Sequence, residues 1–187
     1  PSPKGAARAH ELLQRAVDPL RVEGRALFAG LRSLTMPTTA LGATWRLADT
    51  LREYRGDSHI AAWISEGLDA VEMCLLTDSF SGRPLRTYSA TRGWTDEQFD
   101  PATERLIARG LLDATGGTYT EAGREIRSHI ELNTDRQMYL AIDAIEDELT
   151  ELMEILAPWA QAIKDANGYP KMGPQEMAIA AAKATTK

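Results

Sequence analysis

The stretch 84–123 limits the possible folds more than any other part of this sequence, because it carries helix and turn signals in a fixed order. Pro84 suits the first turn of a helix, and Gly93 ends that helix. Thr95 and Gln98 then have the spacing of a capping box, which predicts the start of a second helix. The order predicts two helices joined by a tight turn.

The second helix contains Pro101, which leaves its start open. A proline inside a helix removes a backbone donor and clashes with the preceding turn. Either the first turn after Thr95 is separate, or the helix restarts with Asp100 as its cap and runs to Arg109-Gly110.

A short hairpin is predicted after the second helix. Two extended pieces, 111–113 and 118–120, flank Gly116-Gly117, and glycine supplies the positive φ angles of a tight turn. Thr120 then caps a long helix. We therefore predict a mainly α, winged helix-turn-helix fold with a short β-hairpin wing and long terminal helices.

Upstream, the spacing of apolar residues predicts three short helices. The first begins after Thr38 or Thr39 and stops at Gly56, and the second begins there and is broken at Gly67. Asp69 caps the third.

Four segments together resemble one known family, the SalK-type helix-turn-helix proteins of the MarR-like winged-helix group. They are Leu51-Arg-Glu-Tyr-Arg-Gly-Asp-Ser-His-Ile-Ala-Ala, Arg92-Gly-Trp-Thr-Asp-Glu-Gln-Phe, Arg105-Leu-Ile-Ala-Arg-Gly-Leu-Leu-Asp and Tyr119-Thr-Glu-Ala-Gly-Arg. The resemblance implies a winged helix whose second helix enters the DNA major groove, and a homodimer formed through the terminal helices.

Composition excludes several classes of protein. The chain holds 21 Lys and Arg against 27 Asp and Glu, a formal charge of -6, so DNA binding requires a local basic patch. No apolar run approaches the roughly 18 to 20 residues that span a bilayer, and the N-terminus lacks a signal-peptide stretch, so we expect a cytoplasmic protein with no membrane partner. One cysteine, Cys74, and three scattered histidines predict no disulfide, no metal site and no cofactor.

Five arginines in and around the helix pair are candidate DNA contacts. They are Arg83, Arg86, Arg92, Arg105 and Arg109. Asp96, Glu97 and Asp100 open the second helix, where they either oppose DNA phosphates or simply complement the helix dipole. DNA binding requires that the exposed guanidinium groups outweigh these carboxylates.

A second group of residues surrounds the expected helix junction at Gly56. Its members are Tyr54, Arg55, His59 and Trp63. An imidazole, a guanidinium and two aromatic rings can line a small-molecule pocket, or they can be ordinary helix-end and core residues.

The clearest helical periodicity lies near the C-terminus, where an apolar seam spans about three heptads. We assign five of its residues to a dimer seam: Ile142, Ile145, Leu149, Leu152 and Leu156. The seam can pack on the N-terminal helix of the same chain or of a second copy, and a homodimer is the prediction.

The expected organisation is an N-terminal helical segment (1–35), a winged-helix domain with its dimerisation helix (36–170) and a flexible tail (171–187). The predicted function is a MarR-like DNA-binding transcriptional regulator that responds to a small-molecule ligand, with double-stranded DNA as a partner. The alternative is a winged-helix scaffold that does not bind DNA and binds or converts a small molecule in a biosynthetic pathway. No catalytic residue is assigned.

Overall fold

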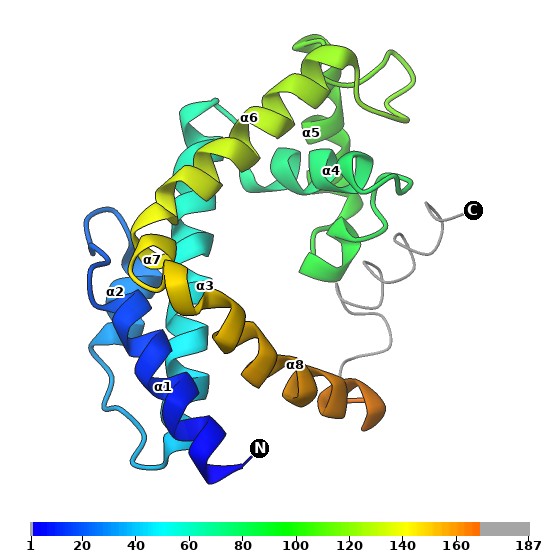
Figure 1. Ribbon diagram of the computed structural model, residues 1–187. Helices are drawn as coiled ribbons and strands as arrows, with labels where there is room; N and C mark the ends of the chain where they lie inside the picture. The colour runs from blue at the N-terminus through cyan, green and yellow to red at the C-terminus, as the bar shows by residue number, and fades with distance from the viewer. Residues whose placement is uncertain (1, 169–187) are drawn as a thin grey trace. The chain divides into compact units, whose positions relative to one another are not determined.

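The computed structural model describes residues 2–168, and the chain folds into helices (Figure 1). In chain order these are α1 (Pro3–Val17), α2 (Ala26–Arg32), α3 (Ala40–Ser65), α4 (Ala70–Phe80), the 3-10 helix η1 (Ser89–Arg92), α5 (Asp96–Ala108), α6 (Glu121–Gln137), α7 (Tyr139–Asp143), the 3-10 helix η2 (Glu146–Glu148) and α8 (Leu149–Asp165). The expected tail, 171–187, lies outside the described residues. Within the described part, none of the helices has both the length and the apolar character to cross a bilayer.

The helices divide into two compact units. The first contains the described residues up to Ala62 together with Leu132–Ala166, and the second contains Trp63–Glu131. Helices α3 and α6 each run from one unit into the other.

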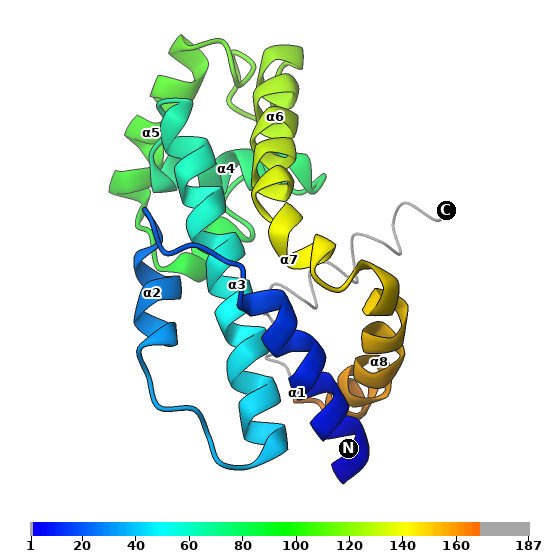
Figure 2. The same ribbon diagram turned by 60° about the vertical axis from the view of Figure 1, so that its left-hand side comes forward.

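The first unit is built around the apolar face of α1. Leu12 is fully buried and Leu13 is 3% exposed, and both belong to one core with residues of α2, α3, α7 and α8. Figure 2 shows α1 running beside α8. At the edge of that contact, the Arg8 guanidinium forms two hydrogen bonds with the Glu151 carboxylate, at 2.9 and 2.7 Å.

Helix α3 is continuous through Gly56, so the predicted helix break there is wrong. Asp57, the next residue, lies within α3. It is buried and accepts a hydrogen bond from the backbone N–H of Phe28 at 2.9 Å, in the first turn of α2. Asp57 therefore caps α2 from a neighbouring helix. One glycine costs a helix roughly 1 kcal/mol, which does not interrupt α3 because residues before and after the glycine are packed in the protein.

In the second unit, α4 and α5 both begin with capping boxes, at Asp69 with Glu72 and at Thr95 with Gln98. Helix α5 begins at Asp96 and tolerates Pro101 in its second turn, which resolves the open start. The predicted first helix of the pair is shorter than expected, because only 89–92 are helical and Arg86 adopts a positive φ of 65°. Gly93, at φ 79°, makes the turn into α5.

The predicted β-hairpin wing is wrong, while the mainly α class fits. Within the described residues there is no strand, and Leu112 with Tyr119 forms an isolated antiparallel bridge. The Asp113 carboxylate accepts hydrogen bonds from the backbone N–H groups of Thr115 and Gly117, both at 3.0 Å, which closes a compact turn. Thr120 caps α6 directly afterwards, so too few residues remain on either side to form a ladder.

Candidate nucleic-acid interface

The helix pair consists of η1 and α5, and a buried carboxylate on α4 fixes its entry. Asp78 is fully buried and accepts hydrogen bonds from the Tyr88 backbone N–H at 2.8 Å and from the Ser89 hydroxyl at 2.6 Å. Burial raises the pKa of Asp78, while the hydrogen bonds from Ser89 lower it. Asp78 therefore holds the first turn of η1 against α4.

Arg92 lies at the end of η1, directly before the turn. Its side chain is exposed, and its guanidinium carbon is 4.8 Å from the centre of the Tyr88 ring. A guanidinium N–H donates a hydrogen bond to the Tyr88 hydroxyl. Among residues 2–168, Arg92 forms no ion pair with a carboxylate. The ring contact holds the cation at the surface without neutralising it.

Next to the turn, the Cys74 thiol and the Trp94 indole are close enough to interact. Burial raises the pKa of Cys74, while Trp94 and Arg92 lower it. The net effect favours the neutral thiol, which behaves as a small apolar group.

Arg86 does not extend freely from the helix pair. Its guanidinium pairs with Asp96 at 2.9 Å and with Asp100 at 2.5 Å, on the first turns of α5. These bonds, led by the one to Asp100, raise the pKa of Arg86. Arg86 therefore compensates two of the carboxylates that open α5.

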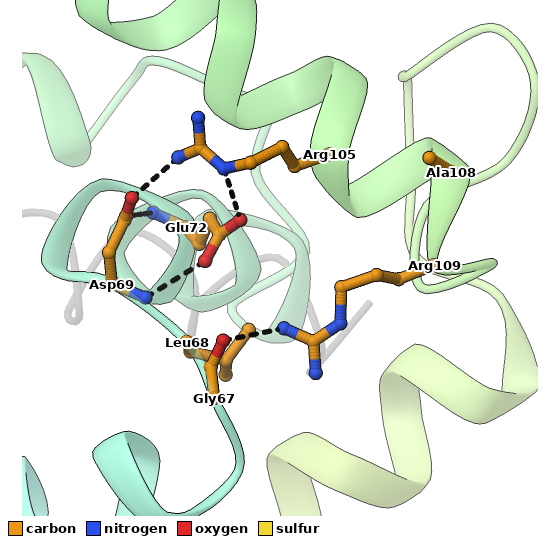
Figure 3. Close-up of a pocket in the computed structure, with 7 residues that line it drawn as sticks. All are labelled: Gly67, Leu68, Asp69, Glu72, Arg105, Ala108 and Arg109. Carbon is orange, nitrogen blue, oxygen red and sulfur yellow. Dashed lines mark hydrogen bonds and ion pairs between the residues drawn. The ribbon is translucent and has the colours of Figure 1, made fainter.

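Arg105 and Arg109 extend from the last turns of α5 toward the turn between α3 and α4 (Figure 3). Arg105 donates to Glu72 and Asp69 at 2.9 and 2.5 Å, and the Glu72 side chain is only 5% exposed. Arg109 donates to the backbone carbonyls of Gly67 and Glu66, at 2.9 and 2.8 Å. Arg105 therefore fastens α5 to the first turn of α4, and Arg109 fastens the end of α5 to the turn that precedes α4.

These groups border a cavity of about 460 Å³ within the second unit. Its lining residues are Gly67, Leu68, Asp69, Glu72, Arg105, Ala108 and Arg109. The volume falls in the range of small-molecule sites, roughly 300 to 1,000 Å³. The two guanidinium groups are balanced by two carboxylates, so the cavity has no net charge from its lining.

The outer side of α5 is acidic. Asp96, Glu97, Asp100 and Glu104 are all exposed. Hydrogen bonding to Thr95 and to the helix N-terminus lowers the pKa of Glu97, which keeps its charge at neutral pH. Arg86 pairs with two of the four carboxylates, and Glu97 and Glu104 form no ion pair with another residue of 2–168.

Arg83 is half-buried beside α4. Its backbone N–H donates to the carbonyl of Asp78 at 3.0 Å, and its positive charge lowers the pKa of Asp78. Within the described residues, Arg83 forms no ion pair with a carboxylate. Of the five predicted DNA contacts, Arg83, Arg92 and Arg109 are thus outside such pairs among the described residues, and Arg109 is instead held by backbone carbonyls.

The residues predicted for a ligand pocket are separately engaged. Tyr54 is 3% exposed, and its ring packs edge-on against Phe28 with the ring centres 4.8 Å apart. The Arg55 guanidinium is 3.2 Å from Asp135, and His59 Nδ1 is 3.0 Å from the Thr134 hydroxyl. Trp63 belongs to the other unit.

The seam predicted for dimerisation contributes to the core of the first unit. Ile145 and Leu152 are buried at 3% and 4% exposure, and Leu149 and Leu156 pack against the same core. Ile142 is 44% exposed. The partner of the seam in this structure is therefore the chain's own α1, together with α3.

Sequence reasoning missed Asp78 and Glu72, the two carboxylates that anchor the helix pair. Glu72 stands three residues after the cap Asp69, a capping-box spacing that could have predicted its role. Asp78 has no such local signal, because its partners are ten and eleven residues away.

Across residues 2–168, no group of three or more His, Cys, Asp and Glu side chains is placed to hold a metal ion. A search of curated proteins and a search of solved structures gave no match.

A family model described as a helix-turn-helix family matches residues 1–170. The match supports, at a coarse level, a DNA-binding regulator, and it does not extend to the MarR-like or SalK-type assignment. Most of the sequence is matched, and η1, Gly93 and α5 supply two helices with a tight turn between them. The chain therefore belongs to a helix-turn-helix family.

Proposed function

We propose that this chain is a DNA-binding transcriptional regulator in which the turn between η1 and α5 approaches the duplex. The observation that carries the proposal is the helix-turn-helix family match over residues 1–170. The finer assignment, a MarR-like or SalK-type regulator with a small-molecule effector, is part of the same proposal and rests on the sequence segments that resemble those proteins.

The roles of the five candidate arginines divide in this proposal. Arg92 contacts a phosphate, since it is exposed at the turn and free of a carboxylate partner among the described residues. Arg83, beside Asp78, supplies a second positive charge. Arg86, Arg105 and Arg109 position α5 through their bonds to the protein.

The salt dependence of DNA binding tests this division. Each phosphate neutralised by a protein cation contributes about 0.9 to the slope of log affinity against log salt. We expect fluorescence anisotropy with a labelled duplex to give a shallow slope for the unmodified protein. Arg92→Ala should reduce that slope by about 1 per chain in contact.

Arg109→Ala is the matched control, because its guanidinium donates to backbone carbonyls and does not meet phosphate in this proposal. Its slope should equal that of the unmodified protein. Binding that is absent, insensitive to salt, or equally affected by both variants would contradict the proposal.

One observation favours a second function, a helix-turn-helix scaffold that does not bind DNA and binds or converts a small molecule. The exposed side of α5 carries Glu97 and Glu104, which have no cation partner in the described part of the chain, and such charges oppose phosphates. In that case the cavity beside Arg105 and Arg109 is the candidate ligand site. Absence of DNA binding after both glutamates are neutralised would favour this second function.

A further inference from the structure

The cavity beside α5 lies wholly within the second unit, and its charges are unevenly placed. Figure 3 shows the Arg105 guanidinium next to the carboxylates of Asp69 and Glu72. The Arg109 guanidinium lies apart from them, at the carbonyl of Gly67. One end of the lining therefore holds two carboxylates and one guanidinium, and the other end holds one guanidinium. The lining is neutral as a whole, but its two ends have opposite net charges.

The positive end is Arg109, which has no carboxylate partner in the part of the chain that the structure describes. Its two hydrogen bonds go to the backbone carbonyls of Gly67 and Glu66, which carry no net charge. The Glu66 carboxylate is not part of the lining, and it lies 3.3 Å from Nε2 of His129. A guanidinium has five N–H donors, so these two bonds leave donors for a ligand. A ligand carboxylate would pair with a full charge that the carbonyls do not compensate.

The negative end is formed by Asp69 and Glu72. Each carboxylate accepts one hydrogen bond from a backbone N–H, in the capping box of α4, and one from Arg105. A carboxylate has about four lone-pair sites, so each retains capacity to accept. The Asp69 side chain is 50% exposed and that of Glu72 is 5% exposed, so Asp69 is the carboxylate that a ligand reaches. This end attracts a cation and repels a second anionic group.

The spacing of the two ends limits the length of the ligand. Arg105 and Arg109 are four residues apart at the end of α5, so the two ends are about one helical turn apart, roughly 5 to 6 Å. The rest of the lining is Gly67, Leu68 and Ala108, which adds apolar surface. The complementary ligand is neutral overall, with an ammonium group at one end, a carboxylate at the other and a short apolar chain between them.

We propose that this cavity binds a small zwitterion of the ω-amino acid class, with its ammonium group at Asp69 and its carboxylate at Arg109. The inference rests on the second proposed function, because it names the ligand class of the cavity that this function uses. It does not depend on DNA binding. A dianion would place a negative group at Asp69, and a dication would place a positive group at Arg109, so neither class fits.

Isothermal titration calorimetry of the full chain, without DNA, tests the proposal with three probes. δ-Aminovalerate carries both charges, valerate lacks the ammonium group and pentylamine lacks the carboxylate. We expect δ-aminovalerate to bind at least roughly tenfold more tightly than either single-charge probe, because each of its charges meets a group of opposite sign.

Two variants of the lining give a charge-specific readout. Arg109→Gln removes the positive end, so this variant should no longer distinguish δ-aminovalerate from pentylamine. Asp69→Asn removes the negative charge but keeps a residue type that caps helices well, so it should no longer distinguish δ-aminovalerate from valerate.

Arg124→Gln is the matched control for Arg109→Gln. Arg124 is also an exposed arginine of the second unit, at 56% exposure of its side chain, and it lies outside the lining. The change in net charge is the same, so this variant should bind all three probes like the unmodified protein.

The proposal is overturned if the unmodified protein binds none of the probes, or binds δ-aminovalerate no more tightly than a single-charge probe. This comparison needs no variant, so it does not depend on how a substitution affects folding. Unchanged selectivity in Arg109→Gln, or the same loss in Arg124→Gln, would also contradict it. Binding of valerate alone would reject the zwitterion and leave the second function in place, and DNA binding is measured separately by anisotropy.

Discussion

Single carboxylates determine how the helix pair is held, and their roles depend on burial. Asp78 is fully buried and anchors η1, whereas Asp96 and Asp100 are exposed and pair with Arg86. The sequence predicted the capping role of Thr95, because capping depends on a spacing of three residues. It did not predict the partners of the arginines, because these depend on which helices meet.

The pKa of Asp78 leads to a prediction about pH. Burial raises the pKa of Asp78 in the folded protein above its unfolded value of 3.8. At pH values above the folded pKa, the ionised carboxylate therefore lowers the free energy of unfolding. This destabilisation is lost as the pH falls through the folded pKa toward 3.8. In Asp78→Asn the contribution is absent at every pH.

Urea denaturation of both proteins from pH 7 downward measures this effect. The stability of the unmodified protein relative to Asp78→Asn should increase as the pH falls, since all other titrating groups are common to both. If the difference in free energy of unfolding between the two proteins stayed constant with pH, or changed in the opposite direction, ionisation of Asp78 would not destabilise the fold.

Gly123 is required by a close backbone approach at the start of α6. A Cβ atom there would lie 2.0 Å from the carbonyl oxygen of Leu111 and 2.9 Å from Cβ of Tyr119. We expect Gly123→Ala to lower the free energy of unfolding by about 2 to 3 kcal/mol, the upper range of overpacking.

Gly30→Ala serves as the comparison in the same denaturation experiment, because open space surrounds Gly30 in α2. It should raise the stability by roughly 0.5 to 1 kcal/mol through helix propensity. Equal stability of Gly123→Ala and the unmodified protein would refute the close approach.

At the scale of elements, local signals located helix starts better than helix ends. Asp69 and Thr95 were predicted as caps and open α4 and α5. Gly56 was wrongly expected to end a helix, because the packing of α3 on α1 and α2 outweighs the propensity of one residue. The wing was wrongly expected because glycine predicts a turn, not the length of the flanking strands.

The acidic side of α5 gives a prediction at this scale. If α5 faces DNA, changing Glu97 and Glu104 together to Gln should raise the affinity for a duplex roughly thirtyfold at low salt, since two like-charge contacts of about 1 kcal/mol each are removed. Anisotropy titration measures the change.

Glu146→Gln with Glu154→Gln is the matched control, because both residues are exposed in the first unit and the change in net charge is the same. An equal gain in the control, or no gain in the α5 variant, would place the outer side of α5 away from DNA.

At the scale of the whole chain, the net charge of -6 predicted that DNA contact requires a local patch. In the structure three of the five candidate arginines hold α5 in place, so Arg83 and Arg92 are the candidates that remain for such a patch. The periodicity of the seam predicted burial, but periodicity cannot distinguish a neighbouring helix of the same chain from a second copy. That distinction required the position of α1.

The most direct measurement of the central claim is a two-dimensional NMR titration of the isotopically labelled chain with an unlabelled duplex at low salt. The account predicts amide shifts concentrated at 90–95 and the first turn of α5, with Arg92→Ala requiring more duplex to produce them. Shifts confined to other segments, or no shifts at all, would contradict the claim that the turn between η1 and α5 meets DNA.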